Sequence, residues 1–378
     1  MQFSKIIGQE DVKKHLAEMV SHNRLSHALL FTGKEGSGAL PLAIAFSQHI
    51  MCESPANGDS CGVCNACKKA SDLVHPDIHY SYPVIPKKPG DKPVSTDYIS
   101  EWREFITQLP YGNVFDWLQF IGAENKQGNI TAQECNEIIH KLSLKSFESE
   151  FKVLVMWMPE YLDKEGNKLL KLIEEPPANT IFILVAENES QVLPTIVSRT
   201  QMVRVPLLSA EAIEQELMLK AKLSKEQARQ VAAVSGGNYR EAIQIMQNSS
   251  EDWQSMLRDW LNAIMKSGPV AQVKWIEEMS KLGREKQKQF LRYFNHLLGQ
   301  AIKIQIIDPA KVAMPENEKD FAVRLNKMAG IEQQRAMIDE IDKAAYYIER
   351  NANAKMLFHA LTIRLYHIIA DKSFILTT

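Results

Sequence analysis

The chain has 378 residues, of which 45% are hydrophobic and 24% charged, and its formal net charge is -2 at pH 7. This length exceeds what one hydrophobic core normally serves, so two or three domains are expected. The near-neutral charge excludes a globally basic nucleic-acid-binding protein, and any contact with DNA must be local. The start lacks a signal-peptide pattern and no apolar run approaches the roughly 20 residues of a membrane span, so we expect a cytoplasmic protein without a membrane partner.

Short apolar runs rich in β-branched and aromatic residues predict strands at 28–32, 152–156, 181–186 and 202–205. Runs that are apolar on both faces are typical of a parallel sheet covered by helices on each side. After Pro206 the strand pattern disappears and amphipathic helices follow. The sequence therefore predicts an α/β domain over 1–207, a small helical domain over 208–250 and an all-α bundle over 251–378.

Residues 79–129 fit neither the strand nor the helix pattern, because prolines and aromatic residues are frequent there. We interpret this segment as an insertion in the α/β domain. Its aromatic side chains, together with Lys87 and Lys88, are of the kind that stacks on single-stranded nucleic acid. Packing of the same side chains against the sheet is the simpler interpretation, and the one that we favour. The sequence leaves the role of the insertion open.

A cysteine cluster lies at 52–67, with the spacing C-x8-C-x2-C-x2-C formed by Cys52, Cys61, Cys64 and Cys67. Two-residue gaps let neighbouring thiolates turn back onto one ion, and four sulfur ligands close a tetrahedral zinc shell. Such a shell has no open position for water, so the spacing predicts a structural Zn²⁺ ion. A ferredoxin-type iron–sulfur run is the alternative, but that run continues x3-C-P, which is absent here. The fifth cysteine, Cys135, has the helical spacing of a core residue.

The segment Gly33-Lys34-Glu35-Gly36-Ser37-Gly38-Ala39-Leu40 follows the predicted strand at 28–32. A working ATP phosphate loop reads G-x-x-x-x-G-K-[ST], where the lysine reaches the phosphates and the hydroxyl holds magnesium. Here Gly33 and Gly38 occupy the glycine positions, but Ala39 and Leu40 replace both charge-handling residues. Ordinary turn glycines are the alternative interpretation.

The predicted strand at 152–156 supports the first interpretation. An ATPase needs acidic residues at the end of this strand to position magnesium and water. The sequence there runs Val153-Leu154-Val155-Met156-Trp157-Met158-Pro159-Glu160, and apolar residues fill those positions. We therefore read Gly33, Gly36 and Gly38 as a degenerate phosphate loop that does not function, and we expect no ATP binding and no enzymatic activity from the chain by itself.

Several motifs occur in a characteristic order: Ile7-Gly8-Gln9-Glu10, Arg24-Leu25-Ser26-His27-Ala28, the glycine loop, the four cysteines, NKLLKLIEEPP at 167–177 and LPTIVSRT at 193–200. Over residues 3–245 the chain closely resembles the delta-prime subunits of the bacterial DNA polymerase III clamp loader, which are AAA+ proteins. The resemblance implies a RecA-like parallel sheet with helices on both faces, a zinc module, a small helical lid domain and an all-α collar domain for oligomerisation.

The family assembles into a five-subunit ring at the replication fork that uses ATP to open the sliding clamp and load it onto primed DNA. The resemblance thus implies other clamp-loader subunits as partners, with the clamp and primed DNA reached through the complex, and a DNA-directed DNA polymerase holoenzyme as its setting. The delta-prime member is an inactive stator that gives an arginine to a neighbour's ATP site. That arginine falls on Arg199, in Ser198-Arg199-Thr200, where the family has Ser-Arg-Cys.

An arginine supplied in trans stabilises charge on the transferring phosphoryl group. The alternative for Arg199 is an ordinary solvated surface arginine. Arg240 falls where the family places a second nucleotide-sensing arginine, and we expect an interdomain contact or a relic there. Two other functions remain open: an unconventional ATPase, and a zinc-containing nucleic-acid-binding AAA+-like protein that uses the insertion as its platform.

Overall fold

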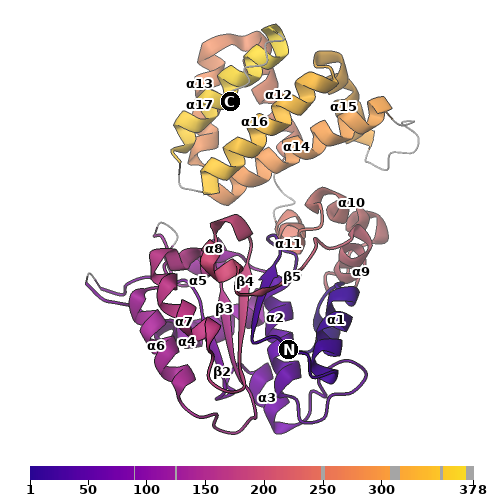
Figure 1. The fold of residues 1–378 in the computed structure, drawn as a ribbon. Coiled ribbons are helices and arrows are strands. Elements are labelled where there is room, and N and C mark those ends of the chain that lie inside the picture. Colours follow the sequence, from indigo (N-terminus) through magenta and orange to yellow (C-terminus); the bar gives the residue numbers. More distant parts are fainter. Residues whose placement is uncertain (89, 124–125, 248–251, 307–315, 350–351, 372–378) are drawn as a thin grey trace. The chain divides into compact units, whose positions relative to one another are not determined.

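The computed structural model describes residues 1–88, 90–123, 126–247, 252–306, 316–349 and 352–371. The chain divides into two compact units, Met1–Gln244 and Ile245–Thr378 (Figure 1). The first unit contains the glycine loop, the cysteine cluster and the insertion, and the second is helical. Among the described residues, no helix combines the length and the apolarity needed to cross a membrane.

The first unit is built on a five-stranded sheet with the order β2-β3-β4-β1-β5, in which all neighbours are parallel. The strands are β1 Ala28–Thr32, β2 Ile78–Ser81, β3 Lys152–Trp157, β4 Thr180–Ala186 and β5 Gln201–Arg204. The four predicted strands are confirmed, each to within one residue at either end. Strand β2 was not predicted, and it overlaps the start of the predicted insertion at residue 79.

Helices cover both faces of this sheet (Figure 1). Alternate residues of the strands point to opposite faces, so Leu29 and Phe31 join one hydrophobic core while Ala28 and Leu30 join the other. The first core also receives side chains from α1 to α5, and the second from α6 and α8. The helices are α1 Glu10–Ser21, α2 Ala39–Met51, α3 Asn65–Ser71, α4 Ile99–Gln108, α5 Val114–Phe120, α6 Ala132–Ser143, α7 Leu170–Glu174 and α8 Pro194–Val197. The predicted α/β architecture, a parallel sheet with helices on both faces, is confirmed.

The aromatic side chains of residues 79–129 largely face inward. Tyr82 and Trp117 are fully buried and Trp102 is 1% exposed. The rings of Tyr82 and Trp102 stack with centroids 4.0 Å apart, and Trp117 lies edge-on to both. The indole Nε1–H of Trp117 donates to the carbonyl of Pro83 at 2.7 Å. These three rings are therefore packed against the sheet, as the favoured interpretation predicted, and offer no stacking surface to a nucleic acid.

Helices follow the sheet to the end of the described chain. In the first unit these are α9 Ala210–Lys220, α10 Lys225–Ser235 and most of α11 Tyr239–Gln247. The second unit holds α12 Trp253–Asn262, α13 Gly268–Lys281, α14 Arg284–Ile306, α15 Glu316–Met328, α16 Ile331–Glu349 and α17 Ala354–Tyr366. Its core centres on Trp260, whose ring stacks on that of Trp275 at 4.6 Å. The predicted boundary between residues 250 and 251 lies outside the described residues, and the separate lid and collar domains stay a prediction.

Candidate functional site

The glycine loop joins the end of β1 to the start of α2 and needs glycine for two separate reasons. Gly36 and Gly38 have φ angles of 71° and 88°, in the left-handed region that L side chains rarely adopt. A Cβ atom on Gly36 would also lie 1.8 Å from Oδ1 of Asn238, and one on Gly38 would lie 2.9 Å from the ring of Tyr111. The strand, loop and helix of a phosphate loop are thus present, with other parts of the chain packed directly on the glycines.

The two residues after the loop point into the protein. Ala39 is 7% exposed and Leu40 is 5% exposed, and both belong to the core on the α2 face of the sheet. A working loop carries its ammonium and hydroxyl groups at these two positions. This loop has neither group there, and its one lysine, Lys34, is exposed.

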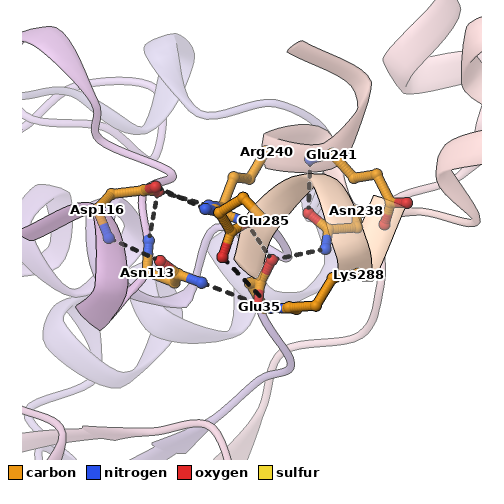
Figure 2. A network of polar contacts seen from close by, with 8 residues as sticks. All are labelled: Glu35, Asn113, Asp116, Asn238, Arg240, Glu241, Glu285 and Lys288. Carbon is orange, nitrogen blue, oxygen red and sulfur yellow. Dashed lines mark hydrogen bonds and ion pairs between the residues drawn. The ribbon is translucent and has the colours of Figure 1, made fainter. Parts of the chain in front are cut away.

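A network of buried charges ties the loop to two distant segments (Figure 2). Arg240, whose side chain is 4% exposed, donates to both carboxylate oxygens of Asp116 at 2.5 and 2.6 Å and to Glu35 of the loop at 3.0 Å. Asn113 and Asn238 donate their side-chain amides to the same Glu35 carboxylate at 3.1 and 3.2 Å. Arg240 thus links α11 to the loop and to α5 within the first unit, and an interdomain role for it stays a prediction.

Little free volume remains beside the loop. The hollow there measures about 20 Å³ and is lined by residues 33–41, 110–112 and three residues at strand ends, Trp157, Val185 and Glu187. A volume of this size holds roughly one water molecule. Tyr111 closes one side of it, since its hydroxyl accepts a hydrogen bond from the N–H of Ile7 at 2.9 Å while its ring lies on Gly38.

The end of β3 carries one acidic group that the sequence analysis did not single out. Glu160 accepts the N–H groups of Glu187 and Asn188, which follow β4, at 2.7 and 2.8 Å. Burial raises the pKa of Glu160, although these backbone donors oppose the shift. Its Oε2 atom has no hydrogen-bond partner in the part of the chain that the structure describes. The carboxylate thus bridges two strand ends, while Trp157 and Met158 before it are buried.

Arg199 lies on the surface between α8 and β5. Its side chain is 35% exposed and its Nε–H donates to Glu174 at the end of α7. One terminal amino group donates to the carbonyl of Thr195 at 2.9 Å and to the Ser198 hydroxyl at 3.1 Å. The guanidinium is held in place but still reachable from solvent, and it lies apart from the glycine loop, whose hollow it does not line.

The four clustered cysteines converge on one point. The Sγ atoms of Cys52, Cys61, Cys64 and Cys67 all lie within 4.8 Å of one another, and those of Cys61 and Cys67 are 3.9 Å apart. A tetrahedron with metal–sulfur bonds of ~2.3 Å has edges of ~3.8 Å, so the sulfur atoms fit a metal of this kind. The four thiols can therefore hold one metal ion. Cys135 is fully buried on α6 and takes no part, as predicted.

Backbone N–H groups point at three of these sulfur atoms. The N–H groups of Cys61, Cys64 and Cys67 donate to the sulfur atoms of Cys52, Cys61 and Cys64, at 3.1, 3.4 and 3.4 Å. Donation by the N–H groups of Cys64 and Val63 lowers the pKa of Cys61 to about 6. Burial instead raises the pKa of Cys52 and of Cys67, so these two thiols must lose a proton when a metal binds, because metals bind the thiolate form.

Sequence reasoning missed Glu35 and Asp116, which form the buried network with Arg240. Asp116 carried one usable signal, since Asn113-x-x-Asp116 is a capping box at the start of α5. Nothing local in the sequence connects residues 35, 116 and 240, which are brought together only by the fold.

Comparison with known proteins agrees with this picture. The sequence model of the family described as "DNA polymerase III, delta subunit" matches residues 8–209. The DNA polymerase III subunit delta′ of Bacillus subtilis (strain 168) is 27% identical over 240 residues, which is 64% of this chain and 60% of that protein. The DNA polymerase III subunit tau of the same organism is 23% identical over 318 residues, which is 82% of this chain and 48% of that protein. The matches thus span between about half and three fifths of these relatives.

Among solved structures, a DNA polymerase III gamma subunit-related protein from Thermotoga maritima aligns with a TM-score of 0.39 and 14% sequence identity. The alignment covers 94% of this chain and 99% of that protein.

Proposed function

The chain belongs to the DNA polymerase III delta subunit family, and from that premise we propose that it is a non-catalytic, delta-prime-type subunit of a clamp loader. It joins other loader subunits in a hetero-pentamer in the bacterial cytoplasm. The complex places the sliding clamp on primed DNA at the replication fork. Within the ring, this chain is a rigid subunit that binds no nucleotide.

The observation that carries the proposal is the state of the glycine loop. Its backbone has the shape of a phosphate loop, but the chain's own Glu35, Arg240 and Asp116 occupy its surroundings and leave about 20 Å³. Ala39 and Leu40 supply neither an ammonium nor a hydroxyl group. An unconventional ATPase would need room for a triphosphate and a cation to neutralise it, so the geometry favours the non-catalytic subunit.

Arg199 is proposed as the arginine that completes a neighbour's ATP site. An arginine finger acting in trans must have a fixed orientation, and it must extend beyond the surface of its own subunit. The ion pair with Glu174 and the bonds to Thr195 and Ser198 hold the guanidinium, and its exposure leaves it accessible to a neighbour. In the complex the neighbour's phosphates take the place of the Glu174 carboxylate.

The cysteine cluster is proposed to hold a structural Zn²⁺ ion. Four thiolates fill its tetrahedral shell, so the ion would tie the segment after α2 to α3 and would supply no open position for catalysis. In this proposal the metal-bound cysteine cluster stabilises the fold of the first unit.

The test is reconstitution with the other loader subunits of the same organism. We expect co-purification as a stable complex, and we expect Arg199→Ala to lower the clamp- and DNA-stimulated ATPase rate by a factor of about 10³ or more, the range known for such fingers. Arg204→Ala is the matched control, because Arg204 is an exposed arginine five residues further on. An Arg199→Ala complex that assembles and keeps the full ATPase rate removes the finger assignment.

Equilibrium binding of labelled ATP to the isolated chain separates the two readings of the loop. The non-catalytic subunit predicts no saturable binding, and micromolar binding would favour the unconventional ATPase. A chain that stays monomeric beside the other loader subunits would count against the assembly itself.

A further inference from the structure

A groove outside the glycine loop lies in the first unit, between α4 and α6. Its volume is about 290 Å³, more than ten times that of the hollow beside the loop. Helix α4 supplies Ile99 and Arg103 to its walls, and α6 supplies Glu134, Ile138 and Lys141. Residues 78–80 of β2 also line it. A hollow of this size with an apolar floor and a few polar groups is typical of a ligand site.

The groove runs along the free edge of the sheet. Strand β2 is the outermost strand, and within the described parts of the chain its one partner strand is β3, with Ile78 opposite Val153 and Tyr80 opposite Val155. The N–H of Val153 donates to the carbonyl of Asp77 at 2.9 Å. Because main-chain groups of successive strand residues point to opposite edges, the groups of Ile78 and Tyr80 then face away from β3. They lie on the side of the groove.

The chain already pairs with this edge just beyond β2. Val84 and Asn129 exchange two main-chain hydrogen bonds, at 3.0 and 2.9 Å, as an isolated antiparallel bridge. The N–H of Tyr82 donates to the hydroxyl of Ser95 at 3.1 Å. The N–H of Ile78 donates to the carbonyl of His75, at 3.2 Å. Among the residues that the structure describes, the carbonyl of Ile78 and both main-chain groups of Tyr80 remain for a short additional strand.

The charges that line the groove favour an anion. Arg103 donates its Nε–H to the carbonyl of Leu73 at 3.1 Å, and its terminal amino groups have no further partner among the described residues. Lys141 forms an ion pair of 3.8 Å with Glu137, which does not line the groove. The one carboxylate of the lining, Glu134, is buried and accepts two hydrogen bonds from Ser95, at 2.7 and 2.8 Å. The lysine and arginine of the lining outnumber its one carboxylate, so the groove carries more positive than negative charge.

We propose that the groove between α4 and α6 binds an extended, acidic peptide segment of a partner protein, which adds as a short strand to the free edge of β2. Main-chain bonds to Tyr80 provide the pairing, the apolar floor takes one β-branched side chain, and Arg103 with Lys141 takes an adjacent carboxylate. The proposal does not depend on the function of the glycine loop or of Arg199.

The test is fluorescence anisotropy of the full-length chain with a labelled eight-residue peptide of alternating valine and glutamate. We expect saturable, salt-sensitive binding that weakens about tenfold in Arg103→Gln/Lys141→Gln, because rim charges set such electrostatic contacts. Lys145→Gln, an exposed lysine outside the groove, is the charge control and should bind as the parent does. A peptide with lysine in place of glutamate should not bind.

A second pair of variants tests the location of the peptide. Thr96→Trp fills the mouth of the groove and should abolish binding, whereas Thr107→Trp, on the exposed side of α4, should not affect it. Equal affinity for a peptide that is N-methylated at every residue would exclude strand addition, because that peptide has no main-chain N–H group left to donate. No saturable binding at millimolar peptide, or equal affinity in the parent and in Arg103→Gln/Lys141→Gln, would overturn the proposal.

Discussion

Arg240 and Asp116 are 124 residues apart in the sequence, yet they form a two-pronged ion pair with N–O distances of 2.5 and 2.6 Å. Both side chains are largely buried, at 4% and 15% exposure. Paired charges in such a position stabilise the fold only as a complete set, since removal of one partner leaves the others buried without compensation. The packing that fills the space beside the glycine loop therefore depends on α11, near the end of the first unit, and on α5, in the 79–129 segment.

Arg240→Ala should lower the free energy of unfolding of the first unit by about 3 to 5 kcal/mol, because it takes the buried guanidinium away from the carboxylates of Asp116 and Glu35. Urea denaturation followed by circular dichroism measures the effect. Arg229→Ala, on the exposed side of α10, is the matched control and should change stability by less than about 0.5 kcal/mol. Arg240→Ala/Asp116→Ala should cost less than the sum of its single variants. Additive costs would mean that the two side chains do not interact in solution.

Gly36→Ala should be much more destabilising than Gly122→Ala, although the two glycines have nearly equal φ angles of 71° and 68°. A Cβ atom on Gly122 would meet no other atom within 4 Å, so only the left-handed backbone opposes alanine there, at about 1 kcal/mol. At Gly36 the added carbon also meets Asn238 at 1.8 Å and must displace it, so about 3 kcal/mol is expected in total. Comparable losses in thermal or urea unfolding would show that Asn238 does not pack on the loop.

The carboxylate of Asp77 should make the free energy of unfolding decrease as the pH is lowered. Its buried carboxylate accepts the N–H groups of Phe147, Glu148 and Ser149, at 2.6, 2.9 and 2.9 Å. Burial alone would raise the pKa of Asp77, but these donors together hold it below its ordinary value. A carboxyl group whose pKa is lower in the folded state stabilises that state above the unfolded pKa of about 3.9, and this contribution is lost as the pH falls through the lower folded pKa.

Asp77→Asn should therefore cost about 2 kcal/mol at pH 7, the size expected for hydrogen bonds to a charged acceptor. The difference from the parent should shrink as the pH is lowered from 5 to 3 in urea titrations. Asp72→Asn, at an exposed position nearby, should show no such trend. A difference that is constant over this range would mean that the charge of Asp77 is not what stabilises the 147–149 segment.

Metal analysis of the chain purified without chelators should find about one zinc ion per molecule, since four sulfur ligands complete one shell. Cys64→Ser should lose the metal, unfold at a lower temperature and no longer respond to a chelator, which should destabilise the parent. Cys135→Ser is the control for loss of a buried thiol and should keep the metal. Iron in the parent, or full zinc content in Cys64→Ser, would contradict the assignment.

The sequence predicted those parts of the fold that depend on local patterns. Strands β1, β3 and β4 were found because each is apolar on both faces and is covered by helices. Strand β5 is a short edge strand with Gln201 and Arg204 exposed, and it was found from the apolar residues at its centre. Strand β2 is equally short and also lies at an edge, but it was missed because His79 and Ser81 interrupt its apolar run. The prolines that follow it made the whole segment resemble an irregular insertion. The cysteine spacing was informative because neighbouring ligands of a metal site are close in sequence.

The packing of other side chains around the glycine loop was not predictable in the same way. Ala39 and Leu40 indicated what the loop lacks, but not what surrounds it. Glu35, Asp116 and Arg240 each have an ordinary local setting, and their contact depends on how α5 and α11 pack on the loop. Long-range charge pairs of this kind leave no periodic signal in one sequence.

Under the proposed function, the burial of Ala39 and Leu40 has a consequence for the history of this chain. Restoring a lysine and a threonine at these two positions would place an ammonium and a hydroxyl group against a core that has closed over the helix start, and Glu35 would still be committed to Arg240. Each step back toward a nucleotide site would thus destabilise the protein before any later step could bring a benefit. Loss of the site in an ancestor of this chain would therefore be hard to reverse, because the packing around Ala39 and Leu40 opposes each step back.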